Sequence, residues 1–147
     1  MKITSTISRL LLGLVFTVFG LNGFLNFFST PPVPPLAGQF LGALVQSHFI
    51  AVVLVIEMIA GLALLLNRMT PLALTLLGPV IFNILLFHIT MAPAGLPPAI
   101  FVTILWLVTA YRVRGAFAGL FQNGGISGRA ARPGTRDLNP EFLHARL

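Results

Sequence analysis

Long apolar runs without charge constrain this chain more than any other feature. An apolar run of about 20 residues crosses a bilayer core of about 30 Å as a helix that rises about 1.5 Å per residue. The runs lie at residues 10–28, 49–66, 71–91 and 96–111, and the last of them is short unless it is extended by a turn. Only 8% of the 147 residues are charged, whereas a soluble domain carries about 25%. We therefore predict an all-α integral membrane protein, folded as a four-helix bundle.

Basic residues flank these runs on one side of the predicted membrane. Lys2 and Arg9 precede the first run, Arg68 separates the second from the third, and Arg112 and Arg114 follow the fourth. The two remaining connections contain no Lys or Arg. Because short basic connections stay on the cytoplasmic side, both termini are expected in the cytoplasm of a multi-pass protein. The net charge of +6 then reflects topology, and we expect no nucleic-acid partner.

The first external connection, residues 29–48, contains four prolines within five residues, which favour an extended entry. Apolar residues then recur at helical spacing from Leu36 to Val45, so we predict a short amphipathic helix on the outer face, with an irregular loop as the alternative. Residues 1–121 are expected to form the membrane domain. Residues 122–147 are expected to form a basic cytoplasmic tail that is largely disordered alone, although its last ten residues carry helix-capping features.

The chain contains no cysteine. This excludes disulfides, thiol-disulfide exchange and thiolate metal sites. The sequence also lacks a phosphate-binding glycine loop, a nucleophile elbow and a metalloprotease motif. We therefore predict no metal site, and any electron transfer would require a partner or a bound cofactor.

Polar side chains inside the apolar runs form the candidate site. They are Asn22, Asn26, Glu57, Asn83 and His88. Counting the helical rise places Glu57, Asn22 and Asn83 roughly 9 to 12 Å below the outer surface, within reach of one shared layer. Asn26 and His88 lie roughly 3 to 5 Å deep by the same count. Together these side chains are predicted to line a path from the outer side down to Glu57.

Helical rotation supports an inward position for Glu57. Ala60 and Gly61 follow it by three and four residues, so the acid shares its face with small residues that allow another helix to approach closely. Asn83 and His88 are five residues apart, about 140° around an ideal helix. They cannot both face the centre of the bundle unless their helix is distorted or each meets a different neighbouring helix.

Each candidate has a structural alternative. The asparagines can serve as interhelical hydrogen-bonding groups, and His88 can lie at the interface or bond to a backbone carbonyl. An acid facing lipid at mid-span costs about 3 kcal/mol, so Glu57 is a functional candidate by default. A low dielectric favours its neutral form unless His88 or a ligand pairs with it, and a neutral acid can donate a hydrogen bond to a carbonyl oxygen. Glu57 and His88 are thus the candidate catalytic residues, and a haem between His48 and His88 is not expected because no spacing requires it.

Three segments carry a resemblance to a known family: "RLLLGLVFTVFGLNGF" from Arg9, Glu57 followed by Gly61 and a leucine run, and "NRMTPLALTLLGPVIFNILLFH" ending at His88. Over roughly residues 7–121 the chain resembles the DoxX family of small bacterial integral membrane proteins. The resemblance implies a four-helix bundle in the bacterial cytoplasmic membrane and an association with membrane redox chemistry, since the family is named from a subunit of a thiosulfate:quinone oxidoreductase. The positions of Glu57, Asn83 and His88 belong to the family's pattern but carry no settled catalytic role.

Three functions are compatible with these observations. The first is a redox-associated membrane subunit that binds a quinone-like molecule in the polar layer. The second is a non-catalytic scaffold or assembly subunit, whose basic tail docks a cytoplasmic partner. The third is a transporter of a lipid or small hydrophobic molecule, which would require oligomerisation, for example through Gly13, Gly20 and Gly23. The expected partners are membrane lipids together with other subunits or further copies of the chain.

Overall fold

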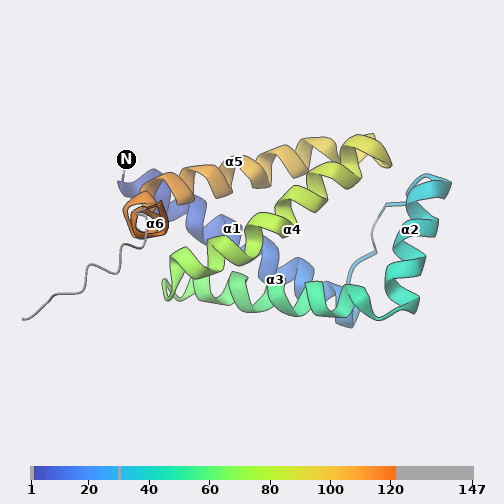
Figure 1. The fold of residues 1–147 in the computed structure, drawn as a ribbon. Coiled ribbons are helices and arrows are strands. Elements are labelled where there is room, and N and C mark those ends of the chain that lie inside the picture. The colour runs from blue at the N-terminus through green and yellow to red at the C-terminus, as the bar shows by residue number, and fades with distance from the viewer. Residues whose placement is uncertain (1, 30, 122–147) are drawn as a thin grey trace, which may run out of the picture.

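The computed structural model describes residues 2–29 and 31–121, and the regular elements within this part are helices (Figure 1). They are α1 (Lys2–Leu25), α2 (Pro35–Gln46), α3 (Phe49–Leu65), α4 (Thr70–Thr90), the 3₁₀ turn η1 (Pro93–Gly95), α5 (Leu96–Arg112) and α6 (Arg114–Phe121). No strand occurs among the described residues. The all-α prediction is confirmed for this part of the chain. The predicted tail, residues 122–147, lies outside it.

Several of these helices are long and apolar enough to cross a membrane. The segments Ile3–Leu25, Thr70–Thr90 and Pro93–Arg112 qualify individually, whereas α2 and α3 qualify only as a pair bent by 86°. The described part therefore has three helices that could span a membrane, or four if the bent pair forms one span. This is the pattern expected of a multi-pass membrane protein.

The helix bounds follow the apolar runs closely, with one difference. Helices α3, α4 and α5 begin and end within one residue of the corresponding runs. Helix α1 instead begins at Lys2 and ends at Leu25, while the first run spans 10–28. The early start reflects Ser5 and Ser8, which are polar but buried in the fold.

The four long helices pack as a ring of neighbours. Helix α1 contacts α3 and α5, and α4 also contacts α3 and α5, with the most extensive contact between α1 and α3. Their buried apolar side chains form one core, which includes Leu12, Phe16, Leu64, Leu77 and Leu105. Burial of such side chains stabilises helix packing through dispersion contacts in a lipid environment as well as in water.

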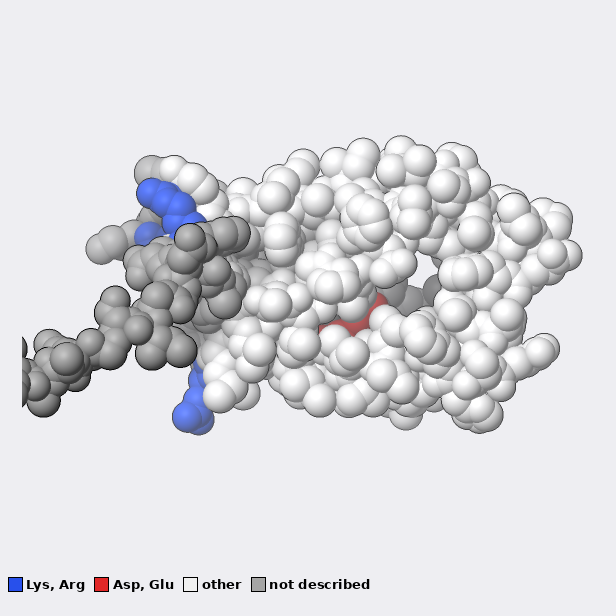
Figure 2. Space-filling view, in the orientation of Figure 1, with Lys and Arg blue, Asp and Glu red and all other residues white. Residues whose placement is uncertain are grey.

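The arginines of the described residues gather at one end of the molecule, here called the basic end (Figure 2). Arg9 is partly buried there, and its guanidinium donates to the carbonyl oxygen of Leu64 and, at 3.4 Å, to that of Leu65. These carbonyls lie in the last turn of α3, where a cation is favoured by the helix dipole. The opposite end, which carries α2, is here called the α2 end.

Packing is uneven along the molecule. On α3 no residue between 49 and 56 is buried, and on α4 none between 82 and 91 is. Glu57 and Ile81 are consequently the buried residues of these helices nearest to the α2 end. In Figure 1, α4 rises away from α3 toward that end. The helices therefore enclose a tight core at the basic end and separate toward the α2 end.

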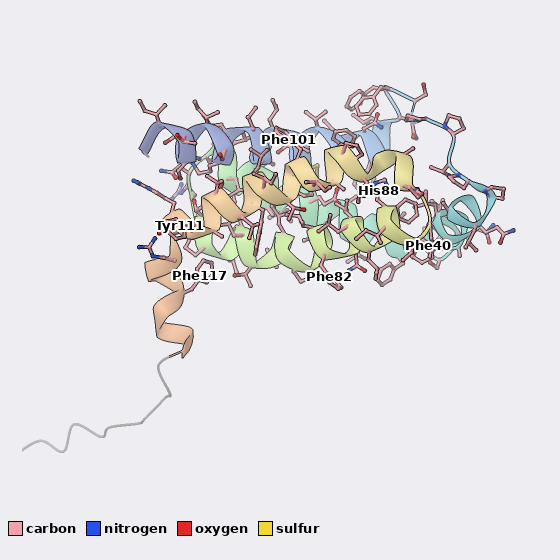
Figure 3. All side chains as sticks on the ribbon, turned by 90° about the horizontal axis from the view of Figure 1, so that it is seen from above. Phe40, Phe82, His88, Phe101, Tyr111 and Phe117 are labelled. Atoms are coloured by element: carbon pink, nitrogen blue, oxygen red, sulfur yellow. The ribbon has the colours of Figure 1, made fainter. Side chains whose placement is uncertain are left out.

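Helix α2 lies across the separated end. It forms where a helix was predicted, with Pro35 in its first turn, and its chain turns by 86° into α3 at His48, whose φ is 59°. Ala37 is fully buried, and the rings of Phe40 and Phe87 lie 6.0 Å apart between their centroids. Figure 3 shows Phe40 at this end of the molecule, far from Tyr111 and Phe117 at the basic end. Helix α2 is thus attached to both α3 and α4.

Candidate functional site

Glu57 lies at the close contact between α1 and α3. A Cβ atom added to Gly20 would stand 3.1 Å from the carbonyl oxygen of Leu54 and 3.2 Å from the backbone nitrogen of Met58. The backbone of α1 therefore runs against the two turns of α3 that flank the acid. Only 9% of the Glu57 surface is exposed, so the prediction that it faces inward agrees with the structure.

The carboxyl group of Glu57 has no hydrogen bond or ion pair with any residue that the structure describes. Among Asp and Glu residues only Glu57 falls in the described part, so the red atoms in Figure 2 belong to it. They lie beside an opening in the visible surface, between α3 and the diverging end of α4 (Figures 1 and 2). A carboxyl group on a largely buried residue is costly when it has no partner, and this one borders space that another molecule can enter.

Thr17 is a second polar side chain at the same contact. A Cβ atom added to Gly61 would stand 2.6 Å from the Thr17 hydroxyl oxygen and 2.9 Å from the Gly13 carbonyl oxygen. Gly61 is one turn from Glu57 along α3, so the Thr17 hydroxyl lies within about one helical turn of the acid. Because Gly61 has no side chain, its Cα–H group can contact both the Thr17 hydroxyl oxygen and the Gly13 carbonyl oxygen.

The Thr17 hydroxyl is buried and has no hydrogen-bond partner in the described structure. Thr75, Thr90, Thr103 and Thr109 behave differently, since each donates to the carbonyl oxygen four residues earlier, at 2.7 to 2.9 Å. Sequence analysis did not identify Thr17 as a candidate. Its spacing from Gly13 and Gly20 was the available signal, because small residues at such spacing mark close helix contacts.

Asn22 is buried, but its amide is already engaged. Its Oδ1 accepts from the Phe28 backbone nitrogen at 3.0 Å, and its Nδ2 donates to the Phe28 carbonyl oxygen at 3.2 Å. These bonds fold the chain back after α1. Asn26 is exposed with a φ of 48°, and its backbone nitrogen donates to the Asn22 carbonyl oxygen at 2.8 Å. It ends the helix as asparagine commonly does in the left-handed region, so it does not line a path to Glu57.

Asn83 differs most from its predicted position. It is exposed, and its Nδ2 donates to the carbonyl oxygen of Pro79 at 2.9 Å. The expectation that it shares a layer with Glu57 is therefore wrong. Helix α4 is apolar on nearly all faces, so its sequence did not determine which face turns toward the core.

His88 lies near the end of α4, where its ring is held by the following turn. Its Nδ1 is 3.0 Å from the carbonyl oxygen of Ala92, and its ring packs edge-on against Phe87 with centroids 5.2 Å apart. A Cβ atom at Gly95 would collide with this ring, so any larger residue there would displace the His88 side chain. His88 thus adopts the backbone-bonded alternative and stabilises the turn into η1. His48 is exposed at the bend between α2 and α3.

The structure therefore brings together a smaller site than the sequence predicted. Glu57 and Thr17 supply polar groups without partners, and Asn22 is buried on the same helix as Thr17. The other three candidates, Asn26, Asn83 and His88, are engaged in ending or bracing helices. Within the described residues no group of His, Asp and Glu is positioned to hold a metal ion.

This arrangement can bind and orient a polar group on an otherwise apolar molecule. A carboxyl group accepts hydrogen bonds when charged and also donates one when neutral, and a hydroxyl group does both. Comparison of the chain with profiles of protein families, with curated proteins and with solved structures yields no match.

Proposed function

We propose that the chain crosses the membrane four times, through α1, α3, α4 and α5, as a DoxX-like four-helix bundle of the bacterial cytoplasmic membrane. The basic end faces the cytoplasm in this proposal, together with both termini. The gathering of arginines at that end supports it, because basic connections are retained on the cytoplasmic side. The 17-residue length of α3 is about 26 Å, which suffices for a slightly thinned bilayer core.

Within this bundle, the opening beside Glu57 binds a quinone-like molecule that enters from the α2 end. The observation that carries this proposal is that Glu57 is largely buried, with a carboxyl group that has no partner among the described residues, at the boundary between the tight core and the separated helices. An apolar molecule with a ring carbonyl would fill the opening and accept a hydrogen bond from the acid. The resulting bond would offset the cost of burying that group.

The proposed role is that of a redox-associated subunit. Glu57 would orient the carbonyl and exchange a proton with it. Electrons would come from another subunit or a bound cofactor, since this chain has no cysteine to carry them. Whether the chain catalyses a step or only presents the quinone depends on that partner.

The test is photolabelling of the full chain in lipid vesicles with a photoreactive short-chain quinone. The variants are Glu57→Leu, which removes the polar group, and Glu57→Gln, which keeps a donor and an acceptor. Asn83→Leu is the matched control, because Asn83 is a polar residue of a long helix that faces away from the site.

Loss of one hydrogen bond to a buried group corresponds to about a tenfold loss of affinity. We expect that loss for Glu57→Leu, a smaller one for Glu57→Gln and none for Asn83→Leu, with the label located on α1 and α3. Equal labelling of the wild type and Glu57→Leu would reject the quinone site and favour a scaffold role.

A further inference from the structure

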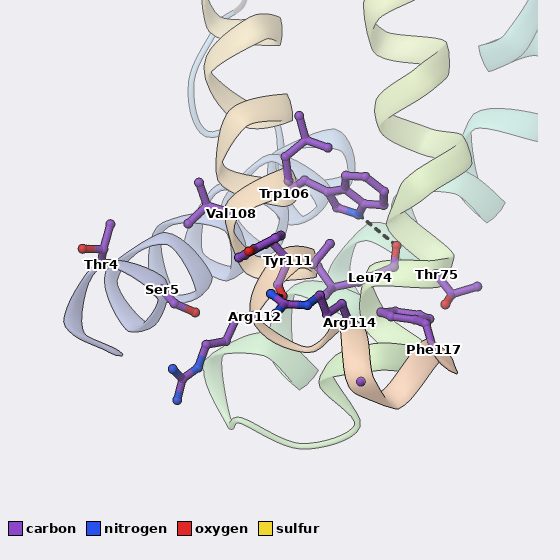
Figure 4. A pocket seen from close by; sticks show the side chains of 13 residues that line it. Thr4, Ser5, Leu74, Thr75, Trp106, Val108, Tyr111, Arg112, Arg114 and Phe117 are labelled. Carbon is purple, nitrogen blue, oxygen red and sulfur yellow. Dashed lines mark hydrogen bonds between the residues drawn. The ribbon is translucent and has the colours of Figure 1, made fainter. Parts of the chain in front are cut away.

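A second cavity lies at the basic end, away from Glu57. Its volume is about 1200 Å³, and it is bounded by the start of α1, the first half of α4, the end of α5 and the start of α6. The residues that matter most to its chemistry are Leu74, Trp106, Tyr111, Arg112, Arg114 and Phe117. Figure 4 shows these side chains around the cavity. Its size is sufficient for part of an amphiphile rather than a small ion alone.

The floor of the cavity is apolar. The Trp106 indole nitrogen donates to the Leu74 carbonyl oxygen at 2.9 Å, as the dashed line in Figure 4 marks. The polar atom of the indole is therefore satisfied, and the rest of the ring system offers apolar surface. Gly78 packs beside the ring, since an added Cβ atom would stand at an ordinary contact distance of 3.5 Å from it. Phe117 adds a second aromatic ring from α6.

The rim of the cavity is positively charged. The Arg114 guanidinium lies 4.1 Å from the centroid of the Tyr111 ring and donates to the Tyr111 carbonyl oxygen at 3.4 Å. Arg112 is exposed and forms no ion pair within the described part of the chain. Among the residues that the structure describes, no acidic one lines the cavity. Two guanidinium groups thus border an apolar cavity without a neutralising carboxylate.

We propose that this cavity binds one molecule of an anionic phospholipid. A guanidinium group can donate two parallel hydrogen bonds to two oxygens of one phosphate. Arg112 and Arg114 are therefore suited to binding the phosphate of the headgroup. The apolar floor at Trp106 and Phe117 accommodates an acyl chain, which inorganic phosphate lacks. The cavity lies at the start of α1 and the end of α5. In helices that span a membrane, such termini lie at the depth where the lipid headgroup meets the acyl chain. This inference uses none of the residues around Glu57, so either proposal can fail without the other.

Trp106 makes the proposal measurable, because it is the single tryptophan of the chain. Bromine atoms on an acyl chain quench indole fluorescence only at short range. The full chain is placed in phosphatidylcholine vesicles that contain a small fraction of brominated lipid, either phosphatidylglycerol or phosphatidylcholine. We expect half-maximal quenching at roughly a tenfold lower fraction of brominated phosphatidylglycerol, since each arginine contributes substantially to anionic lipid binding.

Three variants identify the cavity as the cause. The double variant Arg112→Gln with Arg114→Gln should abolish the preference for phosphatidylglycerol, whereas Arg68→Gln, at the same end but outside the cavity, should retain it. Gly115→Phe should lower quenching by both brominated lipids, because Gly115 lines the cavity and a Cβ atom there meets nothing within 4 Å. Equal quenching of the wild type by the two lipids, or loss of the preference in Arg68→Gln, would overturn the proposal.

Discussion

At the scale of single residues, Glu57 costs free energy to bury and has a carboxyl group that is able to bind a ligand. Only 9% of the Glu57 surface is exposed, and its carboxyl group has no partner among the described residues, while the neighbouring Ala60, Gly61 and Leu64 are packed. Burying a polar group without a hydrogen bond costs about 1 to 3 kcal/mol. In the proposed function, a ligand completes the bonding of this acid.

The stability of the ligand-free protein should reflect this cost. We expect Glu57→Leu to raise the free energy of unfolding by about 1 to 2 kcal/mol, because the substitution removes the unpaired polar group and adds apolar contacts. Glu57→Gln should be nearly neutral, since it keeps a polar side chain. Thermal unfolding in detergent, with no quinone present, measures both. A large loss of stability in Glu57→Leu would mean that the acid is bonded within the fold.

At the scale of helices, the contact between α1 and α3 positions this site. Gly13 and Gly61 let the two backbones meet, since a Cβ atom on either would stand 2.9 Å from the carbonyl oxygen of the other. Because the two backbones touch there, the neighbouring turns of α1 and α3 cannot shift relative to each other. The contact therefore fixes Glu57 against α1, while α4 is free to separate from α3 beyond Ile81.

Substitution of Gly61 by Ala should test this contact. The added methyl group would lie 2.7 Å from the Thr17 backbone nitrogen, so the helices must move apart, with an expected loss of about 1 to 3 kcal/mol. Gly42→Ala in α2 is the matched control, because its added Cβ atom meets nothing within 4 Å. That variant should be neutral or slightly stabilising, as alanine favours a helix by up to about 1 kcal/mol over glycine. Equal unfolding temperatures for the two variants would contradict the close packing.

At the scale of the whole molecule, the two ends differ in charge and in packing. Within the described part of the chain, the basic end holds the arginines and the core, whereas the α2 end is uncharged and its helices separate (Figures 1 and 2). In the proposed function, the charge sets the direction of insertion, and the separation of the helices sets the side from which a ligand reaches Glu57. Both properties follow from residues at opposite ends of the same helices.

The proposed direction can be tested by cysteine labelling, because the chain has no cysteine of its own. Ser47→Cys and Gly115→Cys each introduce one exposed thiol, at the α2 end and the basic end respectively. In intact bacterial cells with the outer membrane permeabilised, a membrane-impermeant maleimide should label Ser47→Cys and should reach Gly115→Cys only after lysis. The reverse pattern would place the basic end outside.

Much of this architecture could be predicted from the sequence, because apolar length and charge placement specify spans directly. The inward face of Glu57 was also accessible, since Ala60 and Gly61 mark a close contact. The orientation of Asn83 was not, because α4 is apolar around nearly its whole circumference. Helix α6 was not predicted either, and the role of Asn26 depends on a backbone angle that the sequence permits but does not require.

The central claim is that the Glu57 carboxyl group bonds to a quinone-like molecule. Infrared difference spectroscopy with ¹³C-labelled glutamate tests it most directly, because the chain has only two glutamates, Glu57 and Glu141. Addition of a short-chain quinone should shift a glutamate carboxyl band in the wild type, and in Glu141→Gln, but not in Glu57→Gln. A spectrum in which quinone shifts no glutamate band, or shifts it equally in Glu57→Gln, would contradict the account.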